Sequence, residues 1–152
     1  MSYFYRILRQ FVCFVNLPYF CDQFLTMSIL KKIFGEKPKE TVSKLKWIPL
    51  TELSQLIEIS NSEKTVGVFK HSTRCSISSM VKRQFERGFE LEQDQIDMYY
   101  LDLIAYREIS NEVAQKYRLQ HESPQLLIIK NDKLVAEGSH SGILNIDLSK
   151  LI

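Results

Sequence analysis

Cysteine is scarce in this chain, and its few thiols are unevenly placed. The 152 residues contain three cysteines, Cys13, Cys21 and Cys75, of which only Cys75 lies in the part with a globular sequence pattern. A framework of disulfides across that part is therefore excluded. A single unpaired thiol in a folded domain is typical of a reducing compartment, which favours the cytoplasm.

Long apolar runs and a strong net charge are also missing. The longest uncharged run of the apolar leader (residues 1–26) extends from Gln10 to Cys21, which is shorter than the roughly 20 residues of a spanning helix. We therefore expect no transmembrane span. The net charge of +2 gives no reason to expect a nucleic-acid partner. Six lysines gather within residues 27–46, as in a solvated linker.

Residues 1–46 are expected to form an N-terminal extension and a basic linker, followed by one domain at 47–152. The leader has a basic start and an apolar middle but no small-residue cleavage site, so a signal peptide is weakly supported. Met27 begins a segment that looks like a natural protein start. The favoured interpretation makes residues 1–26 an upstream extension of the reading frame.

Beyond the linker, apolar patterns of helical and strand period alternate. We predict strands at 65–70, 98–103, 125–130 and 133–137, with a short apolar stretch at 47–50 that can form a further strand. We predict helices after Thr51, over 76–87, through 109–117 and near the C-terminus.

Local signals mark the ends of several elements. Thr51 is expected to cap the first helix, Gly88 to end the second, and a residue at or just before Ser110 to cap the third. Asn131 and Asp132 predict a tight hairpin turn. The expected apolar helix faces are Leu53, Leu56 and Ile57; Ile77, Met80, Val81 and Phe85; Ile109, Val113, Ala114 and Tyr117; and Leu144, Leu148 and Leu151.

This order of elements predicts an α/β fold with a mixed sheet. Strands separated by helices are parallel neighbours reached by crossovers, whereas the final hairpin is antiparallel. Helices are then expected on both faces of the sheet. With a cysteine at the first strand-to-helix turn, the pattern matches the thioredoxin-like arrangement.

Cys75 is the strongest candidate for chemistry. It stands between the strand at 65–70 and the helix at 76–87, where free N–H groups and the helix dipole favour the reactive thiolate. Its polar neighbours favour an accessible turn over the buried position that a free cysteine often takes. Arg74 would add positive charge, and Ser78 could donate a hydrogen bond to the thiolate. Each of these two also fits an ordinary polar surface position.

The second informative segment is His121–Gln125, directly before a strand. Pro124 stands at the strand's start, where its missing N–H is tolerated without any function. In a thioredoxin-like fold this loop faces the cysteine turn and the proline is cis, so the backbone before it can pair with an incoming thiol. The segment 138–142, which contains His140, could contact a small thiol or form a flexible turn.

Histidine occurs three times in the chain, but no metal site is expected. His71 and His121 could each carry a proton. No cysteine or carboxylate is spaced to make a convincing metal site with either of them.

Three segments resemble the monothiol bacilliredoxin family, also called the bacillithiol-system YtxJ-like family. They are Lys-His-Ser-Thr-Arg-Cys-Ser-Ile-Ser at 70–78, His-Glu-Ser-Pro-Gln at 121–125, and Lys-Asn-Asp-Lys at 130–133 with Ser-His at 139–140. The resemblance covers roughly residues 47–152. The family pattern usually has proline after the cysteine, where this chain has Ser76. That difference loosens the expected helix start but keeps the nucleophile.

The resemblance implies a thiol-disulfide oxidoreductase of the bacterial cytoplasm that removes bacillithiol from protein mixed disulfides. Cys75 would carry off the small thiol, and a second thiol molecule would release it, because position 78 holds a hydroxyl. The implied partners are S-bacillithiolated proteins and bacillithiol with its reducing system. Bacillithiol is the co-substrate, and no tightly bound cofactor is expected. The implied site residues are the catalytic Cys75, Ser78 and Arg74 and the substrate-binding Thr73, Ser76, Ser123, Pro124 and His140.

Three other functions stay open. One is an iron–sulfur carrier of the monothiol-glutaredoxin type, in which a single cysteine and a small thiol hold a shared cluster. Another is a non-catalytic interaction module, with the leader as an anchor. The last is a dithiol reductant that borrows Cys13 or Cys21 as its resolving thiol.

Overall fold

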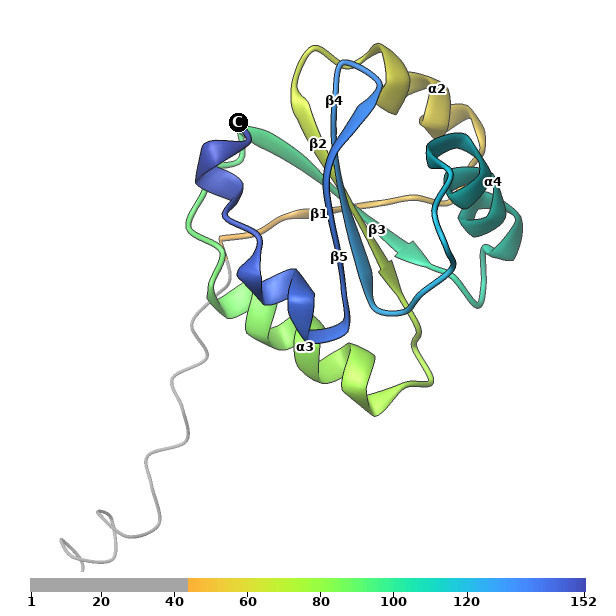
Figure 1. Ribbon diagram of the computed structural model, residues 1–152, viewed down its shortest axis with the longest axis vertical. Helices are drawn as coiled ribbons and strands as arrows, with labels where there is room; N and C mark the ends of the chain where they lie inside the picture. Colours follow the sequence, from red (N-terminus) through yellow and green to blue (C-terminus); the bar gives the residue numbers. More distant parts are fainter. Residues whose placement is uncertain (1–43) are drawn as a thin grey trace, which may run out of the picture. The chain divides into compact units, whose positions relative to one another are not determined.

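The structure is a computed structural model that describes residues 44–152 (Figure 1). The strands are β1 (Trp47–Pro49), β2 (Thr65–His71), β3 (Ile96–Asp102), β4 (Gln125–Lys130) and β5 (Lys133–Ser139). The helices are α2 (Ser54–Asn61), α3 (Ser76–Arg87) and α4 (Arg107–Tyr117), followed by the 3₁₀ helices η1 (His140–Asn145) and η2 (Leu148–Lys150). The predicted order of elements is confirmed, including the short strand at Trp47.

The five strands form one mixed sheet in the order β1-β3-β2-β4-β5. β1 and β2 run parallel to β3, whereas β4 runs antiparallel to β2 and β5 antiparallel to β4. The crossover through α3 between the parallel neighbours β2 and β3 and the antiparallel final hairpin are therefore confirmed. The prediction of parallel neighbours is wrong for the strands on either side of α4, because β4 pairs with β2 and runs antiparallel to it. It is also wrong for β1 and β2, since β3 lies between them. All seven residues of the central strand β2 are buried, which explains its nearly continuous apolar sequence.

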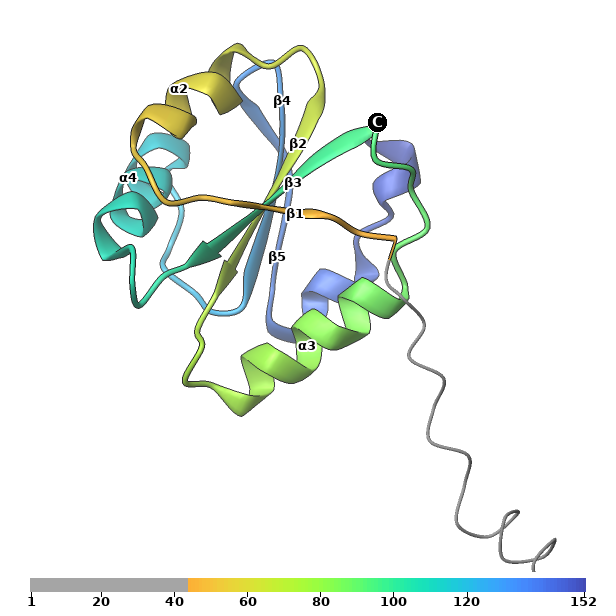
Figure 2. The same ribbon diagram turned by 180° about the vertical axis from the view of Figure 1, so that it is seen from behind.

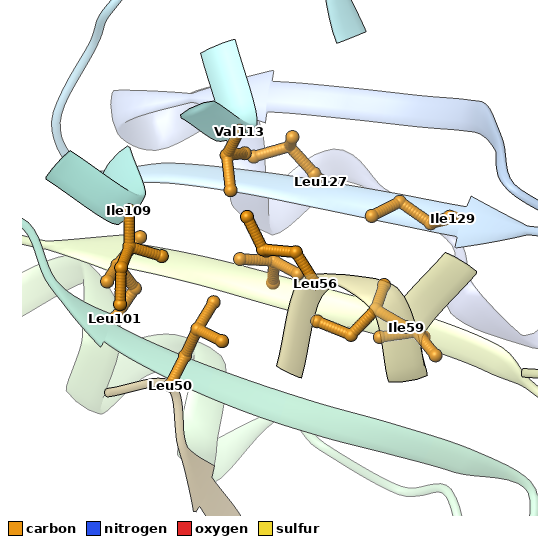
Figure 3. Close-up of a cluster of buried hydrophobic side chains, with 10 residues drawn as sticks. Leu50, Leu56, Ile59, Leu101, Ile109, Val113, Leu127 and Ile129 are labelled. Carbon is orange, nitrogen blue, oxygen red and sulfur yellow. The ribbon is translucent and has the colours of Figure 1, made fainter. Parts of the chain in front are cut away.

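Helices cover both faces of the sheet, as Figures 1 and 2 show, with α2 and α4 on one side and α3 on the other. Figure 3 shows the core under α2 and α4, which is built from aliphatic side chains such as Leu56, Val113 and Leu127. The second core cluster contains Phe69, Phe85 and Ile143 and lies under α3 and η1. Side chains of a strand alternate between faces, so β2 contributes to both clusters.

Several predicted element boundaries coincide with those of the structure. Cys75 is extended, with φ −106° and ψ 118°, and stands directly before α3, while Gly88 follows its last residue. Asn131 and Asp132 both have positive φ, 50° and 58°, as a two-residue hairpin of the favoured twist requires. β5 continues to Ser139, two residues beyond the predicted end at 137.

The predicted cap of α2 is wrong, and its predicted buried face is right only at Leu56. Thr51 supplies no cap; instead its backbone N–H donates to Oε1 of Gln55 at 2.8 Å. A glutamine side chain within the helix thus satisfies donors before it. The buried residues of α2 are Leu56 and Ile59, whereas the expected Leu53 and Ile57 are 43% and 65% exposed.

The expected apolar face of α3 is also partly wrong. The buried residues of this helix are Ser78, Val81 and Phe85, which follow one another at helical spacing. Ile77 and Met80 are 57% and 53% exposed. The helix is thus turned by about one residue from the expected orientation, and a serine replaces an apolar residue on its inner face.

The start of α4 and the C-terminal region differ from the predictions as well. Ser110 lies inside α4 and is buried, and the residue before the helix, Tyr106, makes no side-chain cap. The predicted last helix is split into η1 and η2. The expected Leu148 and Leu151 pack partly buried against the second core cluster, but Leu144 is 41% exposed and Ile143 is buried instead.

Several expectations lie outside the described residues. They concern the leader at 1–26, the alternative start at Met27, the thiols of Cys13 and Cys21, and most of the linker. The predicted domain boundary at residue 47 therefore stays a prediction. Within residues 44–152, no helix has the length and apolar character to cross a membrane.

Candidate active site

Cys75 lies at the start of α3, in a turn that two backbone hydrogen bonds hold. Its N–H donates to the carbonyl of Ser72 at 3.1 Å, and its carbonyl accepts the N–H of Ser79 at 3.1 Å. The residue is partly exposed, and it is the free cysteine of the described part of the chain. The thiol therefore stands where the predicted chemistry requires it, at a helix N-terminus that solvent reaches.

Ser78 takes a different role from the one predicted. It is fully buried, and its Oγ lies 2.7 Å from Nδ1 of His71 and accepts the N–H of Ser72 at 3.3 Å. Its hydroxyl is thus engaged with the strand end and the turn, and the expected hydrogen bond from Ser78 to the sulfur is absent from the bonds of residues 44–152. Ser78 contacts the frame of the turn rather than the thiol itself.

His71 ends β2 and lies in the second core cluster's layer, on the α3 side of the sheet. Its ring packs between those of Phe69 and Tyr100, with centroids 6.5 and 5.6 Å away. Burial, and secondarily the charge of Lys82, lower the pKa of His71 below its ordinary value. The imidazole is therefore neutral near pH 7.

The loop before β4 lies at the same end of the sheet as the cysteine turn. Lys70 pairs with Gln125 in the ladder between β2 and β4, so the residues after β2 and before β4 are neighbours, as Figures 1 and 2 show. The peptide bond between Ser123 and Pro124 is cis, which confirms the predicted isomer. This places the proline loop beside the turn that carries Cys75.

The residues of this loop have distinct environments. Pro124 is buried, and its carbonyl accepts the N–H of His140 at 2.9 Å. His140 itself is exposed, with a φ of 51°. Oγ of Ser123 is buried and has no hydrogen-bond partner within residues 44–152. The predicted substrate contacts Ser123, Pro124 and His140 thus lie together at the end of the sheet where β4 begins and β5 ends.

The remaining predicted residues belong to the cysteine turn. Thr73, Arg74 and Ser76 are all exposed, so each is available to a substrate. Arg74 forms no ion pair within residues 44–152, and its expected influence on the sulfur rests on its adjacency to Cys75. No cluster of three or more potential metal ligands occurs in this part of the chain.

Sequence reasoning missed a buried polar pair at this end of the sheet. Lys70 and Gln125 are each 1% exposed, and Nζ of Lys70 donates to Oε1 of Gln125 at 3.0 Å. Burial lowers the pKa of Lys70 to about 8. The amide of Gln125 also donates to the carbonyl of Gln120 at 3.2 Å and to Glu137 at 3.3 Å, so the pair braces the loop that precedes the cis-proline.

A signal for the contact between His71 and Ser78 was present in the sequence. His71 has the same strand parity as Phe69, which points it toward α3. Ser78 precedes Val81 and Phe85 by three and seven positions, which puts it on their helix face. The alternation along the strand and the spacing along the helix together place the His71 imidazole and the Ser78 hydroxyl between α3 and the sheet.

Comparisons with known proteins agree with this geometry. The family model described as "Monothiol bacilliredoxin BrxC" matches residues 48–148. A solved structure described as a candidate oxidoreductase with a thioredoxin fold is 32% identical, with a TM-score of 0.57, and the match covers 69% of this chain and 89% of that one.

Thioredoxins of two eukaryotes share the fold at lower identity. For the thioredoxin of Malassezia sympodialis the identity is 20% and the TM-score 0.52, over 68% of this chain and 82% of that one. For the thioredoxin of Trypanosoma brucei brucei the identity is 14% and the TM-score 0.56, over 73% and 95%. The described domain therefore has a thioredoxin fold, and the family model and the 32%-identical structure support a role in thiol oxidoreduction.

Proposed function

The chain belongs to the monothiol bacilliredoxin family, and from this premise we propose that it removes bacillithiol, or a similar low-molecular-weight thiol, from protein mixed disulfides. Cys75 is the attacking thiol. The family and the fold support a thiol oxidoreductase, and the identity of the small thiol is the specific content of the proposal.

The proposed reaction has two exchange steps. In the first, the Cys75 thiolate attacks the small-thiol sulfur of the mixed disulfide; the disulfide between Cys75 and the small thiol forms, and the client cysteine leaves as a thiolate. In the second, a thiolate of another small-thiol molecule attacks that adduct. The symmetrical small-molecule disulfide forms and Cys75 is regenerated. Electrons are conserved, and the small-thiol disulfide is the oxidised product.

The observation that carries this proposal is that residue 78, three positions after Cys75, is not a second cysteine. Residue 78 is a buried serine whose hydroxyl is bonded to His71 and Ser72. Cys75 is the free cysteine of residues 44–152. The domain described thus offers one thiol for exchange, and an external thiol must complete the cycle.

The surroundings of Cys75 fit a substrate with a polar small thiol. Thr73, Arg74 and Ser76 present exposed polar groups, and Ser123 precedes the cis peptide bond. We infer that the backbone at Ser123 pairs with the bound thiol and that His140 contacts its polar groups. The clients are S-bacillithiolated proteins, and a reducing cytoplasm with a bacillithiol-reducing system supplies the turnover.

The test follows the small thiol by mass spectrometry. The reduced full chain is incubated with a protein that carries bacillithiol on a known cysteine, and tryptic peptides are mapped. We expect the client to lose bacillithiol and the peptide that contains Cys75 to gain it. Cys75→Ser should release none, and release by that variant at the parent rate would refute the proposal.

The same preparation separates the competing functions. The absorption spectrum of anaerobically purified protein reports an iron–sulfur cluster, which would support the carrier. A chain that neither accepts bacillithiol nor holds a cluster would fit the non-catalytic module. A matched client carrying glutathione distinguishes a bacillithiol-specific protein from one that accepts any small thiol.

A further inference from the structure

The cysteine turn is tied to α3 by a buried serine and a buried histidine. Oγ of Ser78 is 2.7 Å from Nδ1 of His71 and 3.3 Å from the backbone nitrogen of Ser72. The Ser78 side chain is fully buried and His71 is 5% exposed. Ser72 is the first residue of the turn, and its carbonyl accepts the N–H of Cys75 at 3.1 Å. The serine hydroxyl therefore links the start of the turn to the helix that follows the thiol.

The donors and acceptors around Ser78 favour one direction for its hydrogen bond to His71. A serine hydroxyl has one proton to donate and two lone pairs to accept with. One lone pair of Ser78 accepts the Ser72 N–H. If the hydroxyl proton points at Nδ1 of His71, the Ser78 hydroxyl, the Ser72 N–H and Nδ1 all have partners. If Nδ1 carried the proton instead, the Ser78 hydroxyl would need another acceptor, and residues 44–152 give it none. The favoured imidazole is neutral and protonated on Nε2.

Burial and the charge of Lys82 keep the ring neutral against the charges of two carboxylates. Lys82 and Glu86 face His71 from α3, and Asp102 faces it from β3, where the Tyr100 ring also packs. Burial and Lys82 oppose an imidazolium, and the two carboxylates favour it less strongly. An imidazolium could only donate at Nδ1 and would therefore turn the Ser78 hydroxyl away.

We propose that His71 is a positioning residue for Cys75, whose neutral imidazole orients the Ser78 hydroxyl and through it holds the Ser72–Cys75 turn. This inference rests on the proposed role of Cys75 as the attacking thiol. His71 does not touch the sulfur; it determines how well the turn that presents the sulfur is ordered. The carbonyl of His71 also accepts the N–H of Leu103 at 3.0 Å, which anchors the strand end from its other side.

The direct test is the tautomer of His71, measured in the reduced full chain by long-range ¹H–¹⁵N NMR near pH 7.5. We expect the proton on Nε2 and an Nδ1 that accepts a hydrogen bond. Ser78→Ala removes that donor, so the Nδ1 resonance should move while those of His121 and His140 stay. A proton on Nδ1, or an Nδ1 resonance that does not respond to Ser78→Ala, would overturn the proposal.

Two variants of His71 distinguish the effect of its hydrogen-bond acceptor from the effect of its size. His71→Asn keeps an acceptor near the place of Nδ1, whereas His71→Phe keeps a ring without one. In His71→Phe the Ser72 amide should exchange with deuterium about fivefold faster or more, while in His71→Asn it should stay within roughly twofold of the parent. His121→Asn, at an exposed position of the other loop, is the matched control and should leave this amide unchanged.

The functional readout is the rate at which iodoacetamide alkylates Cys75, because this reaction does not depend on bacillithiol. We expect a loss of roughly threefold to tenfold in His71→Phe and partial rescue in His71→Asn. Equal rates in all variants would refute the positioning role even if the protein removes bacillithiol. A slow His71→Phe variant in a protein that shows no bacillithiol transfer would leave the positioning intact and refute the proposed substrate.

Discussion

Nζ of Lys70 lies 3.0 Å from Oε1 of Gln125, and the two side chains face each other across neighbouring strands with 1% exposure each. A lysine without a carboxylate partner at this depth is costly, because burial disfavours its charged form. This cost appears in the lowered pKa of Lys70, about 8 against an ordinary 10.5. The nearby Arg107 adds to the lowering, and Glu137 opposes it.

The first prediction is that Lys70→Met stabilises the domain near pH 7. Between pH 8 and 10.5 the unfolded chain holds the Lys70 proton more tightly than the folded one, so this group makes stability rise with pH in that range. The shift corresponds to ~3 kcal/mol, offset by about 1 kcal/mol for the lost bond to Gln125. We expect a net gain of ~1–2 kcal/mol in urea unfolding at pH 7, shrinking toward pH 10.5.

The control is Lys133→Met, which removes an exposed lysine of β5. The free energy of unfolding of this variant should differ little from that of the parent, and the difference should not vary with pH. A Lys70→Met protein that is less stable than the parent at pH 7 would contradict the assignment. So would a difference that stays constant from pH 7 to 10.5.

The elements with clear start and stop signals were predictable from the sequence. α3 is bounded by Cys75 and Gly88 as expected, and the hairpin at Asn131 and Asp132 has the positive φ values that its residues favour. The location of Cys75 followed from these boundaries. The cis-proline followed from the fold argument rather than from local preference, because few X-Pro bonds are cis.

The orientation of helices and the buried polar pairs were not predictable by the same means. Ile77 and Ser78 are adjacent on α3, so the apolar pattern alone did not decide which one faces the sheet. Lys70 and Gln125 are 55 positions apart, and lysine is rarely buried. Only the pairing of β2 with β4 brings them together. The contact between Ser78 and His71 had a sequence signal, but only once Ser78 rather than Ile77 is placed on the inner face of α3.

The second prediction concerns Ser76→Pro, which restores the residue usual in the family pattern. Ser76 is the first residue of α3, where a missing N–H breaks no helical bond and proline fits well. Cys75 before it is extended, with φ −106° and ψ 118°, as a residue preceding proline prefers. We expect a gain of ~0.5–1 kcal/mol in the free energy of unfolding, measured in urea.

Ser79→Pro is the control for this change. The N–H of Ser79 donates to the carbonyl of Cys75 at 3.1 Å, so proline there removes a helical bond and should cost ~3 kcal/mol or more. If Ser76→Pro were as destabilising as Ser79→Pro, the turn would not have the backbone conformation described.

The third prediction is that Ser78→Cys converts the one-thiol site into a dithiol site. Residues three apart at a helix start are neighbours, and neutral His71 can accept the proton of the introduced thiol. The adduct between Cys75 and the small thiol should then be short-lived, and an intramolecular disulfide should accumulate. Intact-mass spectrometry after mixing with a mixed-disulfide client follows both species.

Ser76→Cys is the matched control, because it adds a thiol next to Cys75. Adjacent Cα atoms are about 3.8 Å apart, closer than disulfides usually allow, so this variant should keep a long-lived adduct. An adduct on Ser78→Cys that persists as long as on the parent would mean that residue 78 cannot reach the Cys75 sulfur.

The fourth prediction is that a chain starting at Met27 folds and exchanges thiols as the full chain does. Within the described residues, the domain already has two clusters of buried apolar side chains, and the proposed cycle needs no thiol besides Cys75. We expect the same unfolding midpoint and the same rate of small-thiol removal, measured side by side. Loss of exchange that returns with Cys13 or Cys21 would favour the dithiol reductant, whereas loss of folding would show that apolar leader residues pack onto the domain.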